Sequence, residues 1–321
     1  MVDLTEVPRN AAGIATAIDV LKQQFGERLQ TGAAVREQHG HTTTWIENQP
    51  PDAVIFAEST SEVANVVKVC ATHGVPVIPF GTGTSLEGHV NAPAGGISID
   101  LMRMDQILAV HQGDLTCVVQ PGVTREALNT HLRATGLFFP IDPGANASLG
   151  GMAATNASGT NAVRYGTMKD NVIALQAVMA DGRVIETAKR AKKTSAGYDL
   201  TRLLVGSEGT LGLITEVTLR LQGTPEAIRA ARCVFPTVEA ATEAVMATIQ
   251  CGVPVARIEL LDALCVKAAN IYSDLGLPEG KPMLLLEFHG SEAGVTEQVE
   301  MFDSIAQDFG REAFELSLIH I

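Results

Sequence analysis

Three stretches rich in glycine and other small residues, far apart along the chain, constrain its fold more than any other feature. They are Gly81-Thr82-Gly83-Thr84-Ser85-Leu86-Glu87-Gly88, residues 142–166 and residues 206–215. Glycine allows backbone dihedrals and close approaches that a side chain forbids, so main-chain amides in such stretches can reach a ligand. A loop as long as 142–166 with so few apolar residues is uncommon unless it is functional. We therefore expect the three stretches to converge around one elongated ligand.

The apolar segments around these stretches predict a mixed α/β arrangement. Ser59 and Glu62 form a capping-box signature ahead of an apolar helical face, and Gly74 ends that helix. A hairpin is expected to turn at Asp181-Gly182, a dipeptide suited to a type I′ turn. Strands are expected at residues 52–56, 75–79, 96–101, 107–111, 115–120, 172–180 and 183–187, and a helix at residues 125–134.

From residue 224 the sequence alternates between strand and helix patterns. This order predicts a separate domain with helices on one face of a sheet. The best domain boundary lies at Gln222-Gly223-Thr224-Pro225. The expected strands are residues 231–235, 255–260 and 283–289, and the expected helices are residues 238–250, residues 263–272 and a final helix.

The N-terminal region holds a possible pair of metal ligands. Residues 10–30 are expected to be helical and residues 38–44 to form a loop containing His39 and His41. No carboxylate or cysteine lies nearby in that loop, so an ordinary loop is favoured over a metal site. Trp45 and Tyr198 are expected to be packing residues.

The excess of acidic residues excludes whole classes of partner. Asp and Glu number 36 against 23 Lys and Arg, and the net charge of −13 repels phosphate backbones and anionic lipid surfaces, so nucleic acid is not expected as a partner. The five cysteines are widely spaced without a CxxC pair, which is typical of reduced thiols in a cytosolic protein. The sequence shows no signal-peptide pattern and no apolar run as long as a membrane span. We expect a cytoplasmic protein, with docking on a membrane partner left open.

The first stretch resembles a dinucleotide-binding fingerprint only in part. Gly81 and Gly83 fit a GxG pattern after a strand, but Leu86 occupies the position of the third glycine and no helix pattern follows. An NAD-dependent enzyme is therefore the least favoured of the hypotheses. The remaining run of amides with hydroxyl side chains suits an anion-binding nest for a pyrophosphate, and a tight structural turn is an equally weighted alternative.

Taken together, the three stretches are similar in order and spacing to the FAD-binding domain of the vanillyl-alcohol oxidase and p-cresol methylhydroxylase flavoprotein superfamily. Within it, the sequence most resembles the D-lactate dehydrogenase (cytochrome) group and the glycolate oxidase flavin subunit. The resemblance runs from about residue 36 to about residue 311. It rests on Pro79-Phe80-Gly81-Thr82-Gly83-Thr84, on Ala157-Ser158-Gly159-Thr160-Asn161-Ala162-Val163-Arg164-Tyr165-Gly166-Thr167 and on Gly206-Ser207-Glu208-Gly209-Thr210-Leu211-Gly212.

The resemblance implies an α+β protein with a two-subdomain FAD-binding PCMH-type domain over residues 49–223. An N-terminal helical segment and loop would cover residues 1–48, and a partial α+β cap (substrate) domain would cover residues 224–315. Relatives continue well beyond the length of this chain, so an incomplete cap domain is expected. Residues 316–321 are expected to be a non-native tail.

The resemblance also assigns cofactor-binding residues. The loop from Gly81 to Ser85 would hold the FAD pyrophosphate. Because residues 81–86 contain no histidine, FAD is expected to be bound noncovalently, with His89 the residual candidate for a covalent link. The expected cofactor-binding residues are Phe80, Gly81, Thr82, Gly83, Thr84, Ser85, Pro143, Gly144, Ser148, Gly151, Asn156, Ser158, Gly159, Tyr165, Gly166, Glu208, Gly209 and Ile214.

The implied reaction is removal of a hydride from the α-carbon of a D-2-hydroxy acid to flavin N5, followed by electron transfer to a cytochrome or quinone-type acceptor. Relatives place a divalent metal, its histidine ligands and an acid-base group in a His-x-Gly-Asp-Gly-Asn-x-His region that this chain lacks. No metal ligand is therefore expected in this chain, although the full-length parent is a candidate for a divalent metal.

Substrate contacts are expected only from the second domain. Arg257 and Glu259 share one face of a strand, and Glu287 and His289 do likewise on a later strand. This face suits binding of a carboxylate through Arg257, whereas a solvated sheet face or a cross-strand ion pair is the more ordinary alternative.

The sequence thus favours an FAD-dependent D-2-hydroxy-acid dehydrogenase with D-lactate as the substrate. A second hypothesis is the glycolate oxidase flavin subunit, which works with an iron-sulfur partner subunit. A third, from another class, is that this chain alone is an FAD-binding module without turnover.

Overall fold

The computed structural model describes residues 8–191 and 193–317, and these residues form two compact units. The first unit contains the chain up to Ala157 together with residues 167–222. The second unit contains residues 158–166 and the chain from Gly223 onward. The short segment 158–166 therefore leaves the first unit and packs within the second.

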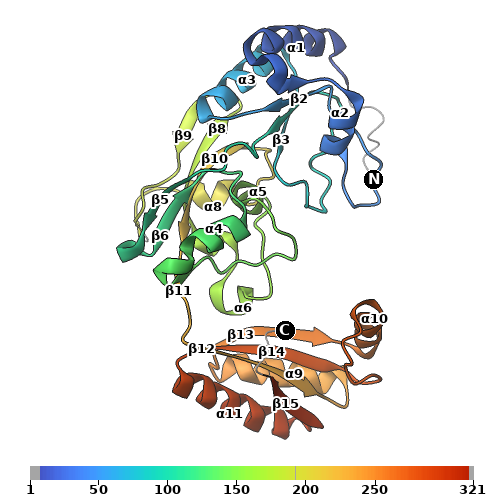
Figure 1. Ribbon diagram of the computed structural model, residues 1–321, viewed down its shortest axis with the longest axis vertical. Helices are drawn as coiled ribbons and strands as arrows, with labels where there is room; N and C mark the ends of the chain where they lie inside the picture. The colour runs from blue at the N-terminus through green and yellow to red at the C-terminus, as the bar shows by residue number, and fades with distance from the viewer. Residues whose placement is uncertain (1–7, 192, 318–321) are drawn as a thin grey trace. The chain divides into compact units, whose positions relative to one another are not determined.

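The first unit begins with a four-stranded sheet in the order β1-β2-β4-β3. β4 pairs in parallel with β2 and β3, while β1 adds to β2 in the antiparallel direction. Figure 1 shows α1 and α3 beside each other over this sheet, and their apolar side chains form one core with its strands. The elements are α1 (Ala11–Phe25), β1 (Leu29–Gln30), α2 (Ala33–Gly40), β2 (Ala53–Phe56), α3 (Thr60–His73), β3 (Val77–Phe80) and β4 (Ile97–Asp100), with a 3-10 helix at Gly26–Arg28.

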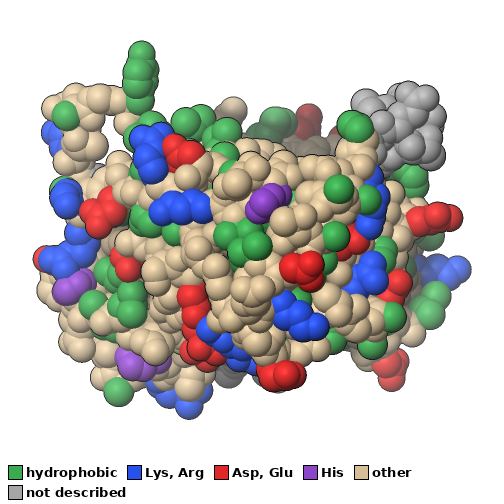
Figure 2. All heavy atoms as spheres, turned by 90° about the horizontal axis from the view of Figure 1, so that it is seen from above, with side chains coloured by type: hydrophobic (Ala, Val, Ile, Leu, Met, Phe, Trp, Pro, Cys, Tyr) green, Lys and Arg blue, Asp and Glu red, His purple; other side chains and the backbone are tan. Residues whose placement is uncertain are grey.

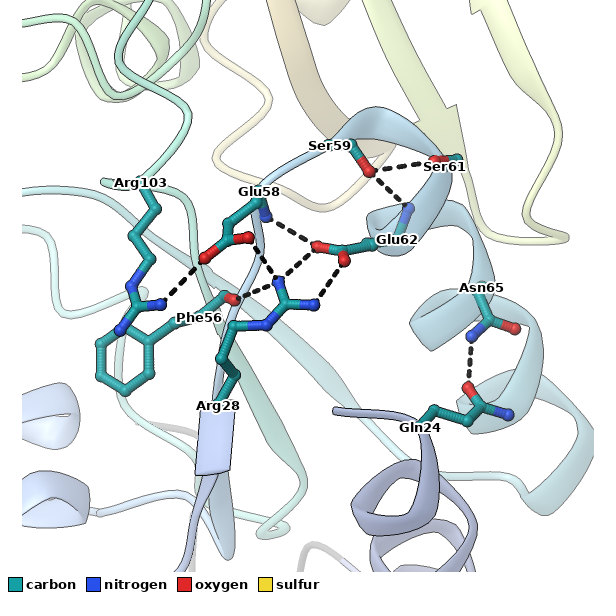
Figure 3. Close-up of polar contacts among 9 residues, drawn as sticks. All are labelled: Gln24, Arg28, Phe56, Glu58, Ser59, Ser61, Glu62, Asn65 and Arg103. Carbon is teal, nitrogen blue, oxygen red and sulfur yellow. Dashed lines mark hydrogen bonds and ion pairs between the residues drawn. The ribbon is translucent and has the colours of Figure 1, made fainter. Parts of the chain in front are cut away.

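Helix α3 forms where local signals predict it. The Ser59 side chain accepts a hydrogen bond from the Glu62 amide, and Gly74 ends the helix in the left-handed conformation. The carboxylate of Glu62 does not complete the predicted capping box: it accepts a hydrogen bond from the Glu58 amide and is bound by both terminal nitrogens of Arg28 (Figure 3). Arg28, which lies outside the helix, thus binds the Glu62 carboxylate that was predicted to cap it.

The second sheet of the first unit is antiparallel throughout, in the order β5-β6-β10-β8-β9. Val178 and Leu213 from this sheet pack into the core of the first sheet, so the two subdomains are joined by shared apolar contacts. The elements are β5 (Ile107–His111), β6 (Thr116–Val119), α4 (Arg125–Leu132), β7 (Leu137–Phe138), α5 (Leu149–Ala154), α7 (Met168–Asn171), β8 (Val172–Met179), β9 (Val184–Glu186), α8 (Leu200–Leu204), β10 (Gly212–Arg220) and β11 (Gln222–Gly223), with 3-10 helices at Gln112–Asp114 and Arg133–Thr135.

The hairpin between β8 and β9 is present, but its predicted type I′ turn is wrong. A type I′ turn needs a positive φ at two successive residues, and only Gly182 has one, at 76°. The amide of Met179 bonds to the Arg183 carbonyl, so three residues form the loop. This is the three-residue hairpin connection in which the last loop residue is left-handed.

The long stretch 142–166 contains more regular structure than predicted. It forms the short helices α5 and α6 (Ala162–Tyr165). Helix α5 is buried because its residues are small: a Cβ added to Gly150 would lie 2.9 Å from the Cα of Pro121. Close packing, and not only ligand access, therefore explains part of the glycine content.

The N-terminal region differs from the prediction at several positions. The first helix ends at Phe25 because Gly26 takes a φ of 53°, and β1 occupies residues predicted to be helical. Residues 38–40 belong to helix α2 instead of a loop, which places His39 in the interior. Trp45 and Tyr198 are not packing residues, since they are 86% and 96% exposed.

The second unit is an antiparallel sheet in the order β13-β14-β12-β15 with helices α9 and α11 against one face (Figure 1). Strand β15 follows the last helix and was not predicted. It pairs with β12 through Ser317, whereas residues 318–321 of the predicted tail lie outside the described residues. The elements are β12 (Ala227–Val234), α9 (Val238–Gln250), β13 (Val255–Leu261), α10 (Ala263–Ser273), β14 (Met283–Gly290), α11 (Glu292–Asp308) and β15 (Ala313–Ser317).

Three further features concern the predictions made from charge, cysteines and hydropathy. Figure 2 shows acidic and basic side chains interspersed on the face seen from above, without a block of either sign. Cys70, Cys117 and Cys233 are buried, and burial raises the pKa of each thiol to about 12, whereas Cys251 and Cys265 are exposed. No helix among the described residues is both long enough and apolar enough to cross a bilayer.

Candidate functional site

The first of the three predicted turns follows directly from strand β3. Phe80 is the last residue of that strand, and Gly83 in the turn lies against its ring with a φ of 67°. The hydroxyls of Thr82 and Thr84 are 3.1 Å apart. Within the described part of the chain, none of the four amides from Thr82 to Ser85 donates a hydrogen bond. The turn therefore presents a run of backbone donors for an external acceptor.

The second turn meets the first at Ser148. A Cβ on Gly81 would clash with the hydroxyl of Ser148 in its present rotamer, so the two residues lie in close contact. Ser148 is 1% exposed, and its Oγ has no hydrogen-bond partner among the described residues. A buried hydroxyl without a partner is costly, so its presence beside the free amides indicates a ligand atom at this point.

The third turn contacts both the second turn and strand β3. The amides of Gly206 and Glu208 donate to the carbonyls of Ala153 and Ala154 at the end of α5, at 3.0 and 2.9 Å. A Cβ on Gly209 would lie 2.6 Å from Cγ of Pro79 in β3. The third turn is thus fixed both to the second turn and to the strand that carries the first.

Two non-glycine residues in these turns have left-handed backbones. Asn156 has a φ of 48° and Glu208 a φ of 50°. The Asn156 side chain accepts from the Thr167 hydroxyl and the Lys169 amide, at 3.2 and 3.0 Å, which holds the end of the second turn in place. Such dihedrals in non-glycine residues concentrate at ligand-binding and active sites.

The remaining predicted cofactor residues are distributed more widely. Gly151 lies against Ser148, whereas Ile214 is buried in the apolar core of the second sheet. Pro143 lies in the loop before Ser148, and a Cβ on Gly144 would meet open space. The predicted residues that belong to the second unit are Ser158, Gly159, Tyr165 and Gly166.

A group of possible metal ligands, not predicted from the sequence, lies beside the first and third turns. Ligand atoms of Glu87, His89 and Glu208 all lie within 4.8 Å of one another. His89 Nδ1 is 3.5 Å from a Glu208 carboxylate oxygen. A hydrogen bond from Ser85 lowers the pKa of Glu87. The sequence shows Glu87 and His89 two positions apart. Glu208 is 119 residues from His89, so the sequence alone does not reveal that the three residues form a group.

A buried histidine below the first turn was also missed. His39 Nε2 lies 2.9 Å from the carboxylate of Asp100, and His39 Nδ1 donates to the Val35 carbonyl at 2.8 Å. The His39 ring packs against Phe80 with their centroids 4.3 Å apart. His39 is thus bonded to Asp100, in line with the expectation that His39 and His41 are not a pair of metal ligands.

The second unit contains a separate buried polar network on the sheet face that α9 and α11 do not cover. Leu284, Leu286 and Phe288 of β14 point into the helical core, and the alternate residues Glu287 and His289 point the other way. The segment 158–166 packs on that second face. The network consists of Asn161, Tyr165, Arg257, Glu287 and His289.

Contacts within this network assign a role to each predicted substrate residue. Arg257 Nε lies 3.5 Å from Glu287 Oε1 and donates to Asn161 Oδ1 at 2.9 Å, which is the cross-strand ion pair of the ordinary alternative. Glu259 on the same strand is exposed. His289 is 3% exposed and contacts Glu287 and Tyr165, at 2.6 and 2.8 Å. Burial raises the pKa of Tyr165, so its hydroxyl is a donor at neutral pH.

Comparison with known families identifies both parts of the chain. Residues 51–188 match the family described as FAD binding domain. Residues 224–317 match the family described as FAD linked oxidases, C-terminal domain. The first match contains the first and second turns and the second contains strands β12 to β15.

Curated relatives agree with the two family matches. A probable mitochondrial D-lactate dehydrogenase of Danio rerio is 51% identical over 90% of this chain and 58% of its own length. A mitochondrial D-lactate dehydrogenase [cytochrome] of Arabidopsis thaliana is 49% identical over 90% of the chain and 51% of its own length. Glycolate oxidase subunit GlcD of Bacillus subtilis is 36% identical over 88% of the chain and 60% of its own length. The chain thus spans about half to three fifths of the length of these relatives.

Solved structures show the same fold. An alkyldihydroxyacetonephosphate synthase is 22% identical with a TM-score of 0.80, covering 96% of this chain and 61% of that one. A p-cresol methylhydroxylase is 16% identical with a TM-score of 0.82, covering 97% of this chain and 67% of that one. The predicted α+β, PCMH-type fold is confirmed by these neighbours and the two family matches. The chain therefore belongs to the FAD-linked oxidases that carry a PCMH-type FAD-binding domain.

Proposed function

We propose that this protein binds FAD noncovalently at the three turns of the first unit and oxidises a D-2-hydroxy acid, D-lactate being favoured, to the 2-oxo acid. The observation that carries the proposal is the convergence of the turns beside Ser148, whose buried hydroxyl has no hydrogen-bond partner in the described part of the chain. The choice of substrate is supported by relatives of 49% and 51% identity that are named D-lactate dehydrogenase.

Residues of the first unit fit FAD by their chemistry. The free amides from Thr82 to Ser85 would bind the pyrophosphate, and the Ser148 hydroxyl would donate to a ligand oxygen. Glu208 and Gly209 would contact the adenosine or flavin edge. Ser158, Gly159 and Gly166 remain predicted flavin contacts.

Bound FAD would supply the hydride acceptor that amino-acid side chains lack. The protein's own residues would orient the substrate, hold its carboxylate and accept the proton of its hydroxyl. We expect electrons to leave for a cytochrome or quinone-type acceptor, in line with the bracketed word in the name of the Arabidopsis relative. A divalent metal in the complete protein and a cytoplasmic location remain predictions, and the two D-lactate dehydrogenase relatives carry mitochondrial names.

Substrate stereochemistry tests the proposal. Purified complete protein is expected to show the visible absorption of a flavin and to reduce an artificial dye with D-lactate but not with L-lactate. Acid precipitation should release the flavin into the supernatant, because the attachment is noncovalent. A colourless protein that takes up no added FAD would contradict the proposal, and a flavin that stays with the pellet would contradict noncovalent binding.

A glycolate oxidase flavin subunit is the second candidate, supported by the 36% identity to GlcD. The two are separated by comparing kcat/KM for glycolate and D-lactate in the same dye assay. A higher value for glycolate, combined with co-purification of an iron-sulfur subunit, would favour the second candidate.

The third hypothesis, that this 321-residue chain binds FAD without turnover, is tested on the chain itself. We expect FAD uptake without D-lactate-dependent dye reduction above the rate of free flavin. Turnover by the isolated chain would refute it.

A further inference from the structure

We infer that His39 and Asp100 form a buried ion pair that positions the first turn for FAD by holding the ring of Phe80. The inference rests on the proposed binding of FAD at the turns, and it adds two positioning residues that the sequence did not connect with the cofactor. The three residues belong to α2, β4 and β3 of the first unit, so every contact lies within that unit.

Strands β2, β4 and β3 end in one row of residues, and the first turn follows directly from that row. Asp100 of β4 pairs with Phe56 of β2 on one side and with Phe80 of β3 on the other. Both pairings are parallel, so the three strands end at the same edge of the sheet. Ligands of open α/β sheets bind beyond this edge. The turn begins at Gly81, so the position of Phe80 sets where the turn starts.

The imidazole ring of His39 contacts all three residues of this row. Its centroid lies 4.3 Å from the centroid of the Phe80 ring and 5.8 Å from that of the Phe56 ring. Its Nε2 lies 2.9 Å from Oδ2 of Asp100, and both residues of this pair are buried. One side chain from α2 therefore holds the ends of three strands.

The partners of the two ring nitrogens require both nitrogens to carry hydrogen. Nδ1 of His39 lies 2.8 Å from the carbonyl oxygen of Val35, and a carbonyl oxygen only accepts. Nε2 faces the Asp100 carboxylate, which in its ionised form also only accepts. The ring is therefore a buried imidazolium paired with a carboxylate, and the other Asp100 oxygen accepts from the Met102 amide at 2.8 Å. Rotation of the ring would break both of its hydrogen bonds, so its orientation is fixed.

Helix α2 is itself held against the segment that leads into β2. Nε of Arg36 donates to the Pro51 carbonyl at 2.6 Å. A Cβ on Gly40 would lie 2.6 Å from the Cα of Pro50, so the end of the helix packs closely on the backbone there. His39 lies between these two anchoring residues of the helix. Its ring is therefore supported by the backbone of α2 and not by the turn.

The ring of Phe80 carries this fixed position to the first turn. Phe80 is buried, and a Cβ on Gly83 would lie only 2.8 Å from its Cζ. The Gly83 backbone is left-handed, with a φ of 67°, so a side chain there would be strained as well as crowded. Among the residues that the structure describes, the amides from Thr82 to Ser85 donate no hydrogen bond. Packing against the Phe80 ring therefore supports a turn that these amides do not tie down.

Preorganisation of the turn gives this support an effect on binding. A loop that already has its bound conformation loses less freedom when the ligand binds, so its affinity is higher. Backbone amides that converge on an anion also need fixed directions to act together. Loss of the support at Phe80 should therefore weaken FAD binding without removing any of the free amides.

Two substitutions that remove the support should raise the Kd for FAD. His39→Gln keeps a donor for Asp100 but removes the ring that packs on Phe80. Phe80→Leu keeps a buried apolar side chain but removes the flat ring that contacts both His39 and Gly83. In the complete protein prepared without FAD, we expect each to raise the Kd by about 2- to 13-fold, the cost of ordering one side chain on binding. Fluorescence titration with FAD measures the Kd.

Asp100→Asn is the conservative variant that separates position from charge. The asparagine amide donates to Nε2 of a neutral ring, while Nδ1 still donates to Val35 and the Met102 amide keeps its acceptor. We expect its Kd to stay within about twofold of the wild type. Asp100→Leu leaves Nε2 without a partner and should raise the Kd as His39→Gln does. The control is His41→Asn, because His41 is exposed.

Two further readouts separate positioning from a general loss of stability. At saturating FAD, kcat in His39→Gln should match the wild type, because only the affinity for the cofactor changes. NMR of the histidine ring nitrogens should show an imidazolium at His39 in the wild type at neutral pH and a neutral ring in Asp100→Asn.

The outcomes also separate this inference from the proposed function. If the wild type binds FAD, an unchanged Kd in His39→Gln or in Phe80→Leu would overturn the inference alone. A neutral His39 ring in the wild type would overturn the ion pair. A wild type that takes up no FAD would overturn the proposed function, and with it the inference.

Discussion

Each unit contains a buried histidine paired with a buried carboxylate, and the two pairs differ in what the second ring nitrogen contacts. In the first unit, His39 bonds Asp100 and the backbone carbonyl of Val35. In the second unit, His289 bonds Glu287 and the hydroxyl of Tyr165. A carbonyl can only accept, so a proton on His39 has no route outward, whereas a hydroxyl both donates and accepts. The second ring nitrogen of the histidine is therefore bonded to the backbone in the first unit and to a side chain in the second.

The surroundings of the two carboxylates differ as well. Glu287 has Arg257 at 3.5 Å in addition to His289. Among the described residues, the ion-pair partner of Asp100 is His39, and its other oxygen accepts from the Met102 amide. Loss of the histidine should thus leave a buried charge in the first unit and a compensated one in the second.

The largest effect on stability is expected from His39→Asn, compared with His289→Asn. Both changes remove the contact to the carboxylate and keep a small polar side chain. Breaking a buried pair and leaving a charge costs about 3–5 kcal/mol, which we expect for His39→Asn. We expect about 1–3 kcal/mol for His289→Asn, the cost of a lost hydrogen bond next to a remaining cation. Urea unfolding followed by circular dichroism measures both.

His41→Asn is the matched control for the first unit, because His41 is exposed and lies two residues from His39. It should change the free energy of unfolding by less than about 0.5 kcal/mol. The comparison would be contradicted if the two substitutions lowered the free energy of unfolding equally, or if His289→Asn lowered it more. Either result would mean that Arg257 does not compensate the charge of Glu287.

Ser148→Ala removes a buried hydroxyl that has no hydrogen-bond partner among the residues described. The affinity for FAD should fall by about 0.5–1.5 kcal/mol, or about 2- to 13-fold in Kd, because a hydrogen bond to the ligand is lost. The FAD-free protein should be no less stable, since the hydroxyl makes no bond within the described chain. Fluorescence titration with FAD gives the Kd. An unchanged Kd together with a destabilised FAD-free protein would show that the hydroxyl serves the fold.

A smaller loss of stability is expected from Arg28→Gln, which removes the arginine that binds the carboxylate of Glu62. Hydrogen bonds from Arg28 lower the pKa of Glu62. A carboxyl with a lowered pKa in the folded state adds stability above its unfolded pKa and loses it as the pH falls through the folded value. Arg28→Gln should therefore cost less than about 1 kcal/mol at pH 7, and the difference from wild type should vanish in acid. A difference that is constant from pH 7 to pH 3 would contradict this.

Local features of the fold could be predicted from the sequence, because neighbouring residues determine them. Ser59 and Gly74 mark the ends of α3 through their own backbone conformations, and the strands around the three turns follow from apolar runs. The turn at Asp181 was assigned the wrong type because two- and three-residue loops share the same dipeptide. Strand β15 was missed because its pairing with β12 involves residues 79 to 87 positions apart.

The candidate site could be predicted only in part for the same reason. The glycines of the three turns are visible as a pattern, and they indicate where a backbone must approach closely. Asp100 lies 61 residues from His39, and Tyr165 lies 124 residues from His289, so no local pattern connects either of these two pairs. The sequence left Arg257 either as a carboxylate-binding residue or as half of a cross-strand ion pair, and the strand register places it opposite Glu287.

Hydrogen exchange of the backbone amides with and without FAD shows whether the three turns bind one ligand together. We predict that one equivalent of FAD slows exchange together in residues 81–85, 148–156 and 206–209, with the greatest change at the amides from Thr82 to Ser85 that donate no bond in the described chain. Protection confined to one of these segments, or none in any of them at saturating FAD, would contradict a shared cofactor site.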